Sequence, residues 1–420
     1  MSLVLKNGIY INYATLEFVK KDIIVDEQKD TLTFVEPDTY HAVVGDQVAD
    51  CSGRYIMHSF GDAYMRPGLS LAPKANVFTK RQSTYFRYVS DILWKIDKCL
   101  DKDLVYASAL YSAIIAAQNG TTFAICRNES SLFIENSLSL VASAFDKVGI
   151  STLQSYAACE ANGYAVAEKA VDENAEFIES HQGLMGIAAS YLASNELLRK
   201  VADICKEKNV GVLVNAAEDN IDQVNTMRDY RRTAVLRFYE LGIMDKSATI
   251  LANCNAITDD ERDYIKNKPA WLAHNPCGNF QRGIKPFNSI WLDNNIMLGS
   301  DFTNCSMPEA LSHAYFESLG TDYESSLTNA YNRLIAIHRY LKLNNFKGDG
   351  ENNLIVFENN SPFELNSDTL IKHIVYNRSV FDIKLVIAKG KIIAKNGHTT
   401  LVDEREAFKY IAEQAKRITC

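Results

Sequence analysis

Residues 184–216 read LMGIAASYLASNELLRKVADICKEKNVGVLVNA, and this stretch contains the repeating unit that decides the fold. Two short apolar runs, 184–189 and 210–216, flank a longer amphipathic segment at 195–208. Buried strands that alternate with helices of this length are typical of βαβ units in a parallel sheet. The stretch therefore predicts an α/β fold.

The same alternation extends over most of the chain. Further strands are expected at residues 55–61, 121–126, 152–157, 248–252, 271–274 and 296–300. With the two strands above they make about eight, the number that closes a (β/α)8 barrel, or TIM barrel. The alternative, an open doubly wound sheet, would need a glycine-rich phosphate loop after its first strand, and Ser59-Phe-Gly-Asp-Ala-Tyr64 is not one.

Both ends of the chain have a different, β-rich pattern. Short strands are expected at residues 3–11, 23–25, 31–35, 41–44, 353–357, 384–388 and 391–394. We therefore predict a small β-sandwich assembled from both chain termini, residues 1–55 and 346–420, beside a barrel formed by residues 56–345. An amphipathic helix at 404–418 is expected to pack on the outside of the sandwich.

Composition and charge restrict the class of partner. The chain has 420 residues, a formal net charge of −8 and 47% hydrophobic residues, which is ordinary for a globular protein. A negative surface repels phosphate backbones and anionic membranes, and no segment approaches about 20 uninterrupted apolar residues. The N-terminus, MSLVLKNGIYINY, also has no signal-peptide pattern. We expect a cytoplasmic protein whose partner is a small-molecule ligand, with no nucleic-acid and no membrane partner.

Motifs at the ends of the predicted strands carry a resemblance that spans the whole chain. They are Gly53-Arg-Tyr-Ile-Met57, Gly120-Thr-Thr122, Asn215-Ala-Ala-Glu-Asp219, Ala252-Asn-Cys254, His274-Asn-Pro276 and Leu298-Gly-Ser-Asp301. In this order they resemble the aminohydrolase and chlorohydrolase branch of the amidohydrolase superfamily, the branch that includes guanine deaminase. The resemblance implies a TIM barrel with its active site where the strands end, and a homodimer as the expected assembly.

The residues that would hold the family's catalytic metal are replaced. By resemblance, Tyr64 and Arg66 stand where two histidine ligands belong, Asn215 stands for a third, and Asn253 stands for a histidine that assists hydrolysis. A guanidinium is a permanent cation that cannot ligate a metal, and an amide oxygen is a weak ligand. The expected cofactor is therefore none, with zinc or iron as the alternative.

Two acidic residues and one histidine remain at the positions that the resemblance makes catalytic: Glu218, Asp301 and His274. We predict that the cation of Arg66 fills the place of the metal and pairs first with Asp301 and secondarily with Glu218, since both carboxylates need a partner when buried. Substrate-binding side chains are expected among Arg66, Arg127, Asn279 and Arg282, which would favour a polar or anionic ligand.

Three functional readings follow from the resemblance and its departures. The first is an amidohydrolase-like protein without metal-dependent hydrolase activity that binds a small polar ligand. The first alternative is a metal-dependent hydrolase or deaminase with a rebuilt site, acting on C–N bonds of purine- or triazine-like substrates. The second alternative is an inactive subunit that pairs with an active paralogue. Whether the chain is an enzyme is left open by the sequence.

Overall fold

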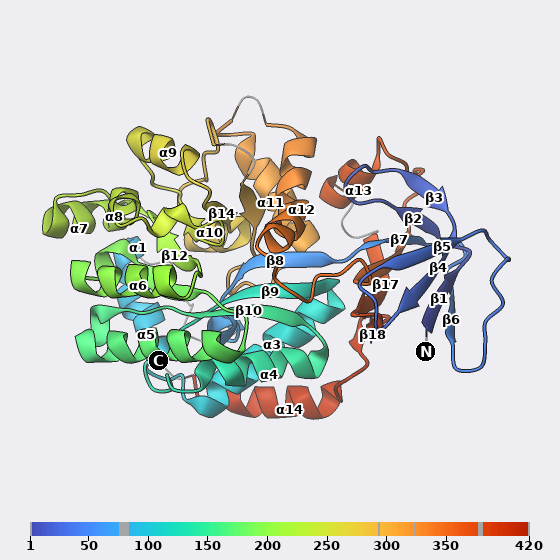
Figure 1. Ribbon diagram of the computed structural model, residues 1–420, viewed down its shortest axis with the longest axis horizontal. Coiled ribbons are helices and arrows are strands. Elements are labelled where there is room, and N and C mark those ends of the chain that lie inside the picture. The colour runs from blue at the N-terminus through green and yellow to red at the C-terminus, as the bar shows by residue number, and fades with distance from the viewer. Residues whose placement is uncertain (1, 75–83, 293–294, 323–324, 377–380, 419–420) are drawn as a thin grey trace.

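The computed structural model describes residues 2–74, 84–292, 295–322, 325–376 and 381–418 (Figure 1). Its larger part is a barrel of eight parallel strands in chain order: β8 (Phe60–Met65), β9 (Thr121–Asn128), β10 (Ser151–Tyr156), β11 (Met185–Ala189), β12 (Val212–Ala216), β13 (Ile250–Asn253), β14 (Trp271–His274) and β15 (Ile296–Leu298). Strands β8 to β10 and β11 to β15 pair as two sheets. Bridges from Met65 to Asp301 and from Ala158 to Ile187 join their edges and close the barrel. The prediction of a (β/α)8 barrel is confirmed.

Helices surround the barrel as the alternating pattern predicts (Figure 1). They are α3 (Lys102–Gln118), α4 (Ser137–Val148), α5 (Tyr164–Ser180), α6 (Asn195–Glu207), α7 (Asn220–Tyr230), α8 (Ala234–Glu240), α9 (Asp259–Lys266), α10 (Pro276–Arg282), α11 (Met307–Ser318) and α12 (Leu327–Leu343). The short helices α1 (Tyr85–Tyr88) and α2 (Trp94–Asp97) lie in the connection between β8 and α3.

Helix α6 illustrates how the sequence specifies each unit. The side chain of Ser194 caps the helix by accepting a hydrogen bond from the backbone N–H of Leu197 at 3.2 Å. The buried residues Leu197, Leu198, Val201 and Cys205 recur at helical spacing and form one apolar face. That face packs into the layer between the helix and strands β11 and β12.

Strand β11 contains a glycine where two backbones come close together. A Cβ atom added to Gly186 would lie 2.1 Å from the carbonyl oxygen of Tyr156 in β10, a distance that no side chain tolerates. We expect Gly186→Ala to lower the free energy of unfolding by about 1–3 kcal/mol, because the two strands must move apart. Urea denaturation measures the change. Gly320→Ala is the control, since its added Cβ would meet nothing closer than 3.7 Å; equal stability of both variants would contradict the expectation.

The second, smaller part is a β-sandwich to which both chain ends contribute (Figure 1). One sheet contains β1 (Ser2–Lys6), β4 (Asp22–Asp26), β5 (Leu32–Val35) and β6 (Gln47–Asp50). The other contains β2 (Ile9–Ile11), β3 (Phe18–Lys20), β7 (Tyr55–His58), β16 (Leu354–Asn359), β17 (Phe381–Ala388), β18 (Lys391–Lys395) and β19 (His398–Thr399). Apolar side chains from the two sheets, among them Leu5, Val25, Ile56 and Val356, form its core.

Two expectations at the chain ends differ from the structure. Residues 41–44 are not a strand; they are exposed and lie in the loop before β6, where Val44 packs against nothing. Helix α14 (Glu404–Ala415) lies along the barrel helix α3, whereas the sequence placed it on the outside of the sandwich (Figure 1). Gln118 Nε2 donates to Glu404 Oε1 at 2.8 Å and holds the two helices together. Helix α13 (Leu370–Tyr376) packs against α11.

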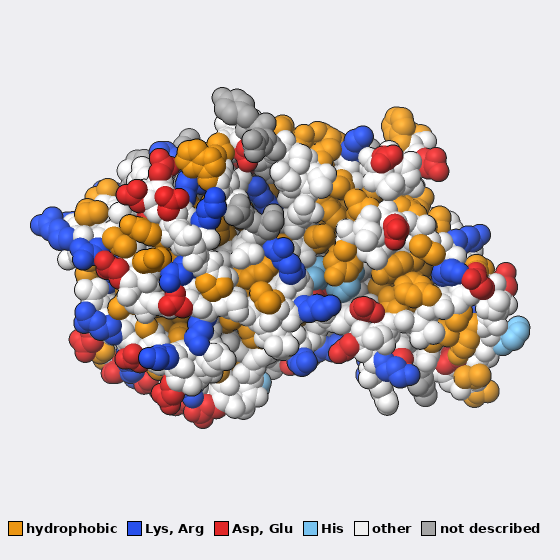
Figure 2. Space-filling view, turned by 45° about the horizontal axis from the view of Figure 1, so that its top comes forward, with side chains coloured by type: hydrophobic (Ala, Val, Ile, Leu, Met, Phe, Trp, Pro, Cys, Tyr) orange, Lys and Arg blue, Asp and Glu red, His pale blue; other side chains and the backbone are white. Residues whose placement is uncertain are grey.

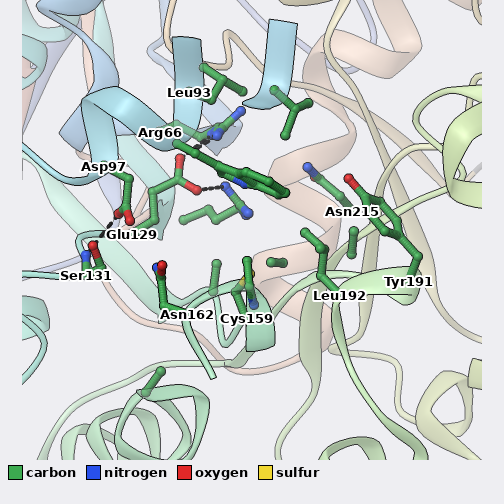
Figure 3. A pocket seen from close by; sticks show the side chains of 18 of the residues that line it. Arg66, Leu93, Asp97, Glu129, Ser131, Cys159, Asn162, Tyr191, Leu192 and Asn215 are labelled. Atoms are coloured by element: carbon green, nitrogen blue, oxygen red, sulfur yellow. Dashed lines mark hydrogen bonds and ion pairs between the residues drawn. The ribbon is translucent and has the colours of Figure 1, made fainter. Parts of the chain in front are cut away.

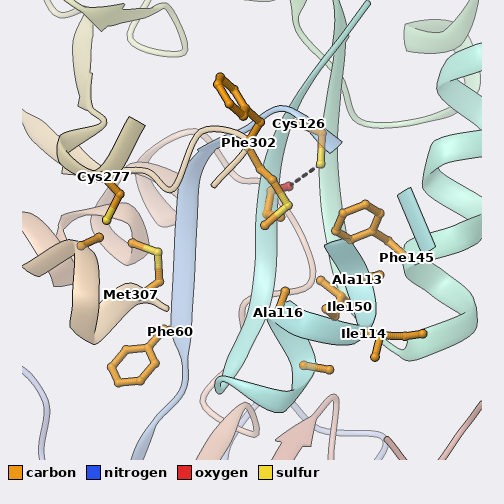
Figure 4. Close-up of a cluster of buried hydrophobic side chains, with 14 of the residues drawn as sticks. Phe60, Ala113, Ile114, Ala116, Cys126, Phe145, Ile150, Cys277, Phe302 and Met307 are labelled. Carbon is orange, nitrogen blue, oxygen red and sulfur yellow. Dashed lines mark hydrogen bonds between the residues drawn. The ribbon is translucent and has the colours of Figure 1, made fainter. Parts of the chain in front are cut away.

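A large apolar core fixes the strands that carry the candidate site. Figure 4 shows part of it, with Phe60 of β8 on the side of Met307 of α11, and Cys126 of β9 on the side of Phe145 of α4. Because interiors pack at crystal-like density, strands held in this way present the residues at their ends in fixed positions.

The surface carries charges of both signs. Figure 2 shows acidic and basic side chains mixed over one face, with apolar side chains scattered between them. None of the helices in the described ranges combines the length and the hydrophobicity that a membrane crossing needs.

Candidate active site at the barrel mouth

Polar residues that the sequence marked at the ends of different strands meet at the mouth of the barrel. Tyr64 lies in β8, and Arg66 comes directly after the strand. Asn215 lies in β12, and Asn253 is the last residue of β13. All four are buried, as are Glu218 and Asp301 in the loops after β12 and β15. Parallel strands end at one rim, so residues from distant parts of the chain form one cluster.

The backbone at this rim is held in an unusual conformation. Ala217, Asn253, Cys254 and Asp301 have φ angles of 47°, 72°, 55° and 57°, in the left-handed region. Residues with a Cβ atom avoid this region, and it persists only where the surrounding structure imposes it. The concentration of such residues at three strand ends is typical of a functional site.

Arg282 forms the centre of the cluster. Its Nη1 pairs with Glu218 Oε1, and its Nη2 pairs with Asp301 Oδ2 at 2.6 Å. The Nε group donates to the carbonyl oxygen of Gly278 at 3.0 Å, and the side chain is 0% exposed. Burial by itself raises the pKa of Glu218, but the Arg282 guanidinium, followed by that of Arg66, holds this pKa below its usual value. Glu218 is therefore ionised at neutral pH.

Gly278 allows this arrangement. It lies one turn before Arg282 in α10, and a Cβ atom there would be 2.5 Å from Asp301 Oδ2. The start of α10 therefore approaches Asp301 closely enough for Arg282 to bridge the two carboxylates. Asn279, expected to bind substrate, supports the same arginine: its Oδ1 accepts from Arg282 Nη2 at 3.3 Å, and its Nδ2 donates to Asn255.

The predicted ion pair between Arg66 and Asp301 is present, but it is the longer of the two that Arg66 forms. Arg66 pairs chiefly with Glu129, to which its Nε donates at 2.9 Å, and its Nη1 lies 3.7 Å from Asp301 Oδ1. Arg127 pairs with the other oxygen of Glu129 at 2.7 Å. Glu129 was not singled out from the sequence, although two buried arginines at strand ends require such an acid. The role given to Arg66 belongs to Arg282.

The residues at the former ligand positions bond to one another. Tyr64 Oη donates to Asn215 Oδ1 at 2.6 Å, and Asn253 Nδ2 donates to Glu218 Oε1 at 3.0 Å. Asn215 Nδ2 lies 3.2 Å from the other oxygen of Glu218, which also accepts from Tyr85 Oη at 2.6 Å. Tyr85 could not be selected from the sequence, because it lies in α1, outside the strand ends.

His274 contacts Glu317, an acid outside this cluster. Its Nε2 lies 2.8 Å from Glu317 Oε2 of α11, and its ring packs on Phe287 with centroids 4.8 Å apart. Glu317 also accepts from the backbone N–H of Phe287 at 2.8 Å. This contact joins the end of β14 to α11, a positioning role that differs from the expected catalytic one.

A cavity of about 100 Å³ opens beside the cluster (Figure 3). Its polar wall contains Arg66, Arg127, Glu129, Asn215 and Glu218, and much of the remainder is aromatic or aliphatic, with Tyr85, Trp94, Tyr156, Tyr191 and Leu192. Figure 3 shows the Arg66 and Glu129 side chains on one side and Tyr191, Leu192 and Asn215 on the other. Such a mixture of flat apolar walls and a few charged groups suits a small heterocyclic ligand.

The residues present do not fit the zinc or iron centre that the family implies. Three carboxylates, Glu129, Glu218 and Asp301, are matched by the guanidinium groups of Arg66, Arg127 and Arg282. Zinc needs about three nitrogen, sulfur or ionised oxygen ligands at about 2.0–2.3 Å. Here the guanidinium of Arg282 lies between Glu218 and Asp301. A divalent ion at this position would be repelled by the positive charge of the guanidinium.

Known proteins with similar sequences and folds are deaminases and related hydrolases. A protein of Methanopyrus kandleri named 5'-deoxyadenosine deaminase is 25% identical, with 100% of both chains covered. A Methanocaldococcus jannaschii protein of the same name is 24% identical over 80% of this chain and 86% of its own. A zinc-bound adenosine deaminase from Xanthomonas campestris superposes with a TM-score of 0.81 at 12% identity, covering 99% and 98% of the two chains. Escherichia coli guanine deaminase gives 0.77 at 16% identity, covering 93% and 99%.

These matches correct the functional expectation. The main reading, a chain without metal-dependent hydrolase activity, is contradicted by relatives named deaminases, which match 100% and 78% of this chain. They favour the first alternative, a metal-dependent hydrolase or deaminase with a rebuilt site that acts on C–N bonds. The sequence model of the amidohydrolase family matches residues 81–393, so the chain belongs to that family.

Proposed function

We propose that the chain is a hydrolase that removes an amino group from a purine-like heterocycle bound at the barrel mouth. The proposal rests on the position of Glu218. This carboxylate lies in the wall of the cavity, is ionised, and is held by Arg282, Asn253 and Tyr85. Similarity to proteins named deaminases, over 100% and 80% of this chain, supports the same reaction class.

The walls of the cavity support a flat, nitrogen-rich substrate. Tyr85, Trp94, Tyr156 and Tyr191 offer aromatic surface against which a ring system can stack. Arg127 Nε is buried and has no hydrogen-bond partner among the described residues, although the rest of its guanidinium pairs with Glu129. A ring nitrogen or oxygen of the substrate would satisfy this donor.

The proposed reaction consumes one water molecule. A C–O bond forms at the ring carbon that carries the amino group, the C–N bond breaks, and ammonia leaves. Glu218 accepts a proton from the attacking water and returns it to the departing nitrogen. Arg66 and Arg127 stabilise the negative charge that develops on the ring, while Arg282 keeps Glu218 oriented.

A panel of aminopurines tests the proposal. The wild-type protein is incubated with adenine, adenosine, 5'-deoxyadenosine and guanine, and ammonium is measured by a coupled assay alongside the ultraviolet spectrum of the ring. We expect ammonium and the matching ring carbonyl in equal amounts from at least one compound. Folded protein that releases no ammonium from any of the four would contradict the proposal.

Tyr85 should contribute through its bond to Glu218. Tyr85→Phe removes a hydrogen bond to a charged group, worth about 1.5–3 kcal/mol, so we expect kcat/KM for deamination to fall by about 10- to 150-fold. Tyr410→Phe is the control, since its hydroxyl bonds to Asp103 at the distant contact between α14 and α3. Equal rates for the two variants would exclude a role for Tyr85.

A further inference from the structure

A second cluster of ligating side chains lies at the other end of the barrel, where the barrel meets the sandwich. His58 ends β7 just before the first barrel strand, His338 lies in α12, and Asp349 lies in the connection from α12 to β16. Their side chains are nearly fully buried. The cluster is distinct from the mouth, because His58 precedes β8 whereas Tyr64 and Arg66 come at its far end.

The geometry of the cluster is compact. One donor atom from each of His58, His338 and Asp349 lies within 4.8 Å of the others. His338 Nδ1 and Asp349 Oδ2 are 2.8 Å apart, and the two imidazole rings have centroids 4.3 Å apart at an angle of 62°. Donors that bind one zinc ion at about 2.0–2.2 Å can be at most about 4.4 Å apart. In the tetrahedral arrangement that zinc prefers, the donors would be about 3.4 Å apart, so side-chain movements of up to about an ångström bring the three around one ion.

The hydrogen bonds of the cluster leave a carboxylate oxygen, Asp349 Oδ1, open to a cation. His58 Nδ1 lies 3.0 Å from the carbonyl oxygen of Ser59, which orients the ring in the way that ligating histidines are commonly held. Asp349 Oδ1 is buried and has no hydrogen-bond partner among the described residues. Among the residues that the structure describes, Asp349 forms an ion pair with His338 and with no arginine or lysine. An unpartnered buried carboxylate oxygen is costly, and a bound cation would remove that cost.

The surroundings shield the cluster and still allow entry. The ring of Tyr13 packs on both histidines, with centroids 5.0 Å from His58 and 5.1 Å from His338. A cavity lined by Tyr13, Asn332 and Arg339 among others reaches His338 from the side of α12. The cavity therefore offers a route to His338 that does not pass through the barrel.

We propose that His58, His338 and Asp349 bind one divalent metal ion of the zinc class. Two imidazoles and one carboxylate are a ligand set that zinc and its neighbours prefer over magnesium or calcium. Because the three residues come from β7, α12 and the segment before β16, the ion ties the barrel to the sandwich. The site is structural and independent of the reaction proposed at the mouth.

Metal analysis tests this site. The full-length protein is produced with added zinc, purified without chelators, and its zinc content is measured by mass spectrometry. We expect about one zinc per chain in the wild type, and at least a ten-fold loss of bound zinc in His338→Asn and in Asp349→Asn. His313→Asn, a half-exposed histidine of α11, and Asp301→Asn at the mouth should both keep the metal.

Zinc below one tenth of an equivalent in the wild type would overturn the proposal, as would zinc retained by both cluster variants or lost from Asp301→Asn. If the cluster variants fail to fold, wild-type crystals decide: an anomalous peak at the zinc edge between His58 and His338 supports the site, and its absence rejects it. Neither result depends on deaminase turnover.

Discussion

Arg282→Met is expected to lower the free energy of unfolding by about 3–5 kcal/mol. The guanidinium of Arg282 is fully buried and bridges Glu218 and Asp301. Methionine fills a similar volume but leaves two buried carboxylates without this counter-charge, and breaking a buried ion pair from one side costs about this much. Urea denaturation followed by circular dichroism measures the change.

Two further variants separate the loss of charge from the loss of packing. Arg282→Met combined with Asp301→Asn removes one of the stranded charges and should recover part of the lost stability. Arg232→Met is the matched control, because Arg232 is 47% exposed and pairs with Glu240 at the surface, so its loss should change the stability by no more than about 0.5 kcal/mol. If the Arg282→Met and Arg232→Met variants had the same free energy of unfolding, the ion bridge from Arg282 to Glu218 and Asp301 would not form.

Glu218→Gln is expected to reduce kcat/KM for deamination by about 10²- to 10⁴-fold, the contribution typical of a general acid–base group. The amide keeps the shape of the side chain but cannot accept a proton from water. Asn253, Tyr85 and Arg282 all bond to Glu218, so the fold of the variant must be verified by its circular dichroism spectrum.

The control for Glu218→Gln is Glu240→Gln, which changes an exposed acid in the same way. It should retain the wild-type rate. If Glu218→Gln retained that rate as well, proton transfer by Glu218 would be excluded, even if ammonium release by the wild type had been demonstrated.

The fold could be predicted because its signal is periodic and distributed. Most of the eight barrel strands are short, largely apolar runs, and α6 shows a serine cap and an apolar face in the sequence itself. The predictions were wrong where the periodic hydrophobic pattern is short or does not identify its partner surface. Residues 41–44 have β-branched side chains but no partner strand, and α14 is amphipathic without any mark of which surface its apolar face meets.

The site could be predicted in position but not in pairing. Strand ends and the resemblance located Glu218, Asp301, Asn215 and Asn253 at one mouth, as the structure has them. The partner of the acids could not be chosen, because a long arginine side chain reaches several carboxylates and the close approach at Gly278 is a tertiary feature. Sequence reasoning therefore selected Arg66, which follows the first strand, and not Arg282.

Transfer of oxygen from water to the product is the direct measure of hydrolytic deamination. The wild-type protein is incubated with the aminopurine that releases most ammonium, in water enriched in oxygen-18, and the product is analysed by mass spectrometry. Hydrolytic deamination predicts one labelled oxygen in the ring carbonyl for each ammonium released, and at least about a hundred-fold slower formation of this product with Glu218→Gln. An unlabelled product, or a heterocycle that remains unchanged, would contradict the account.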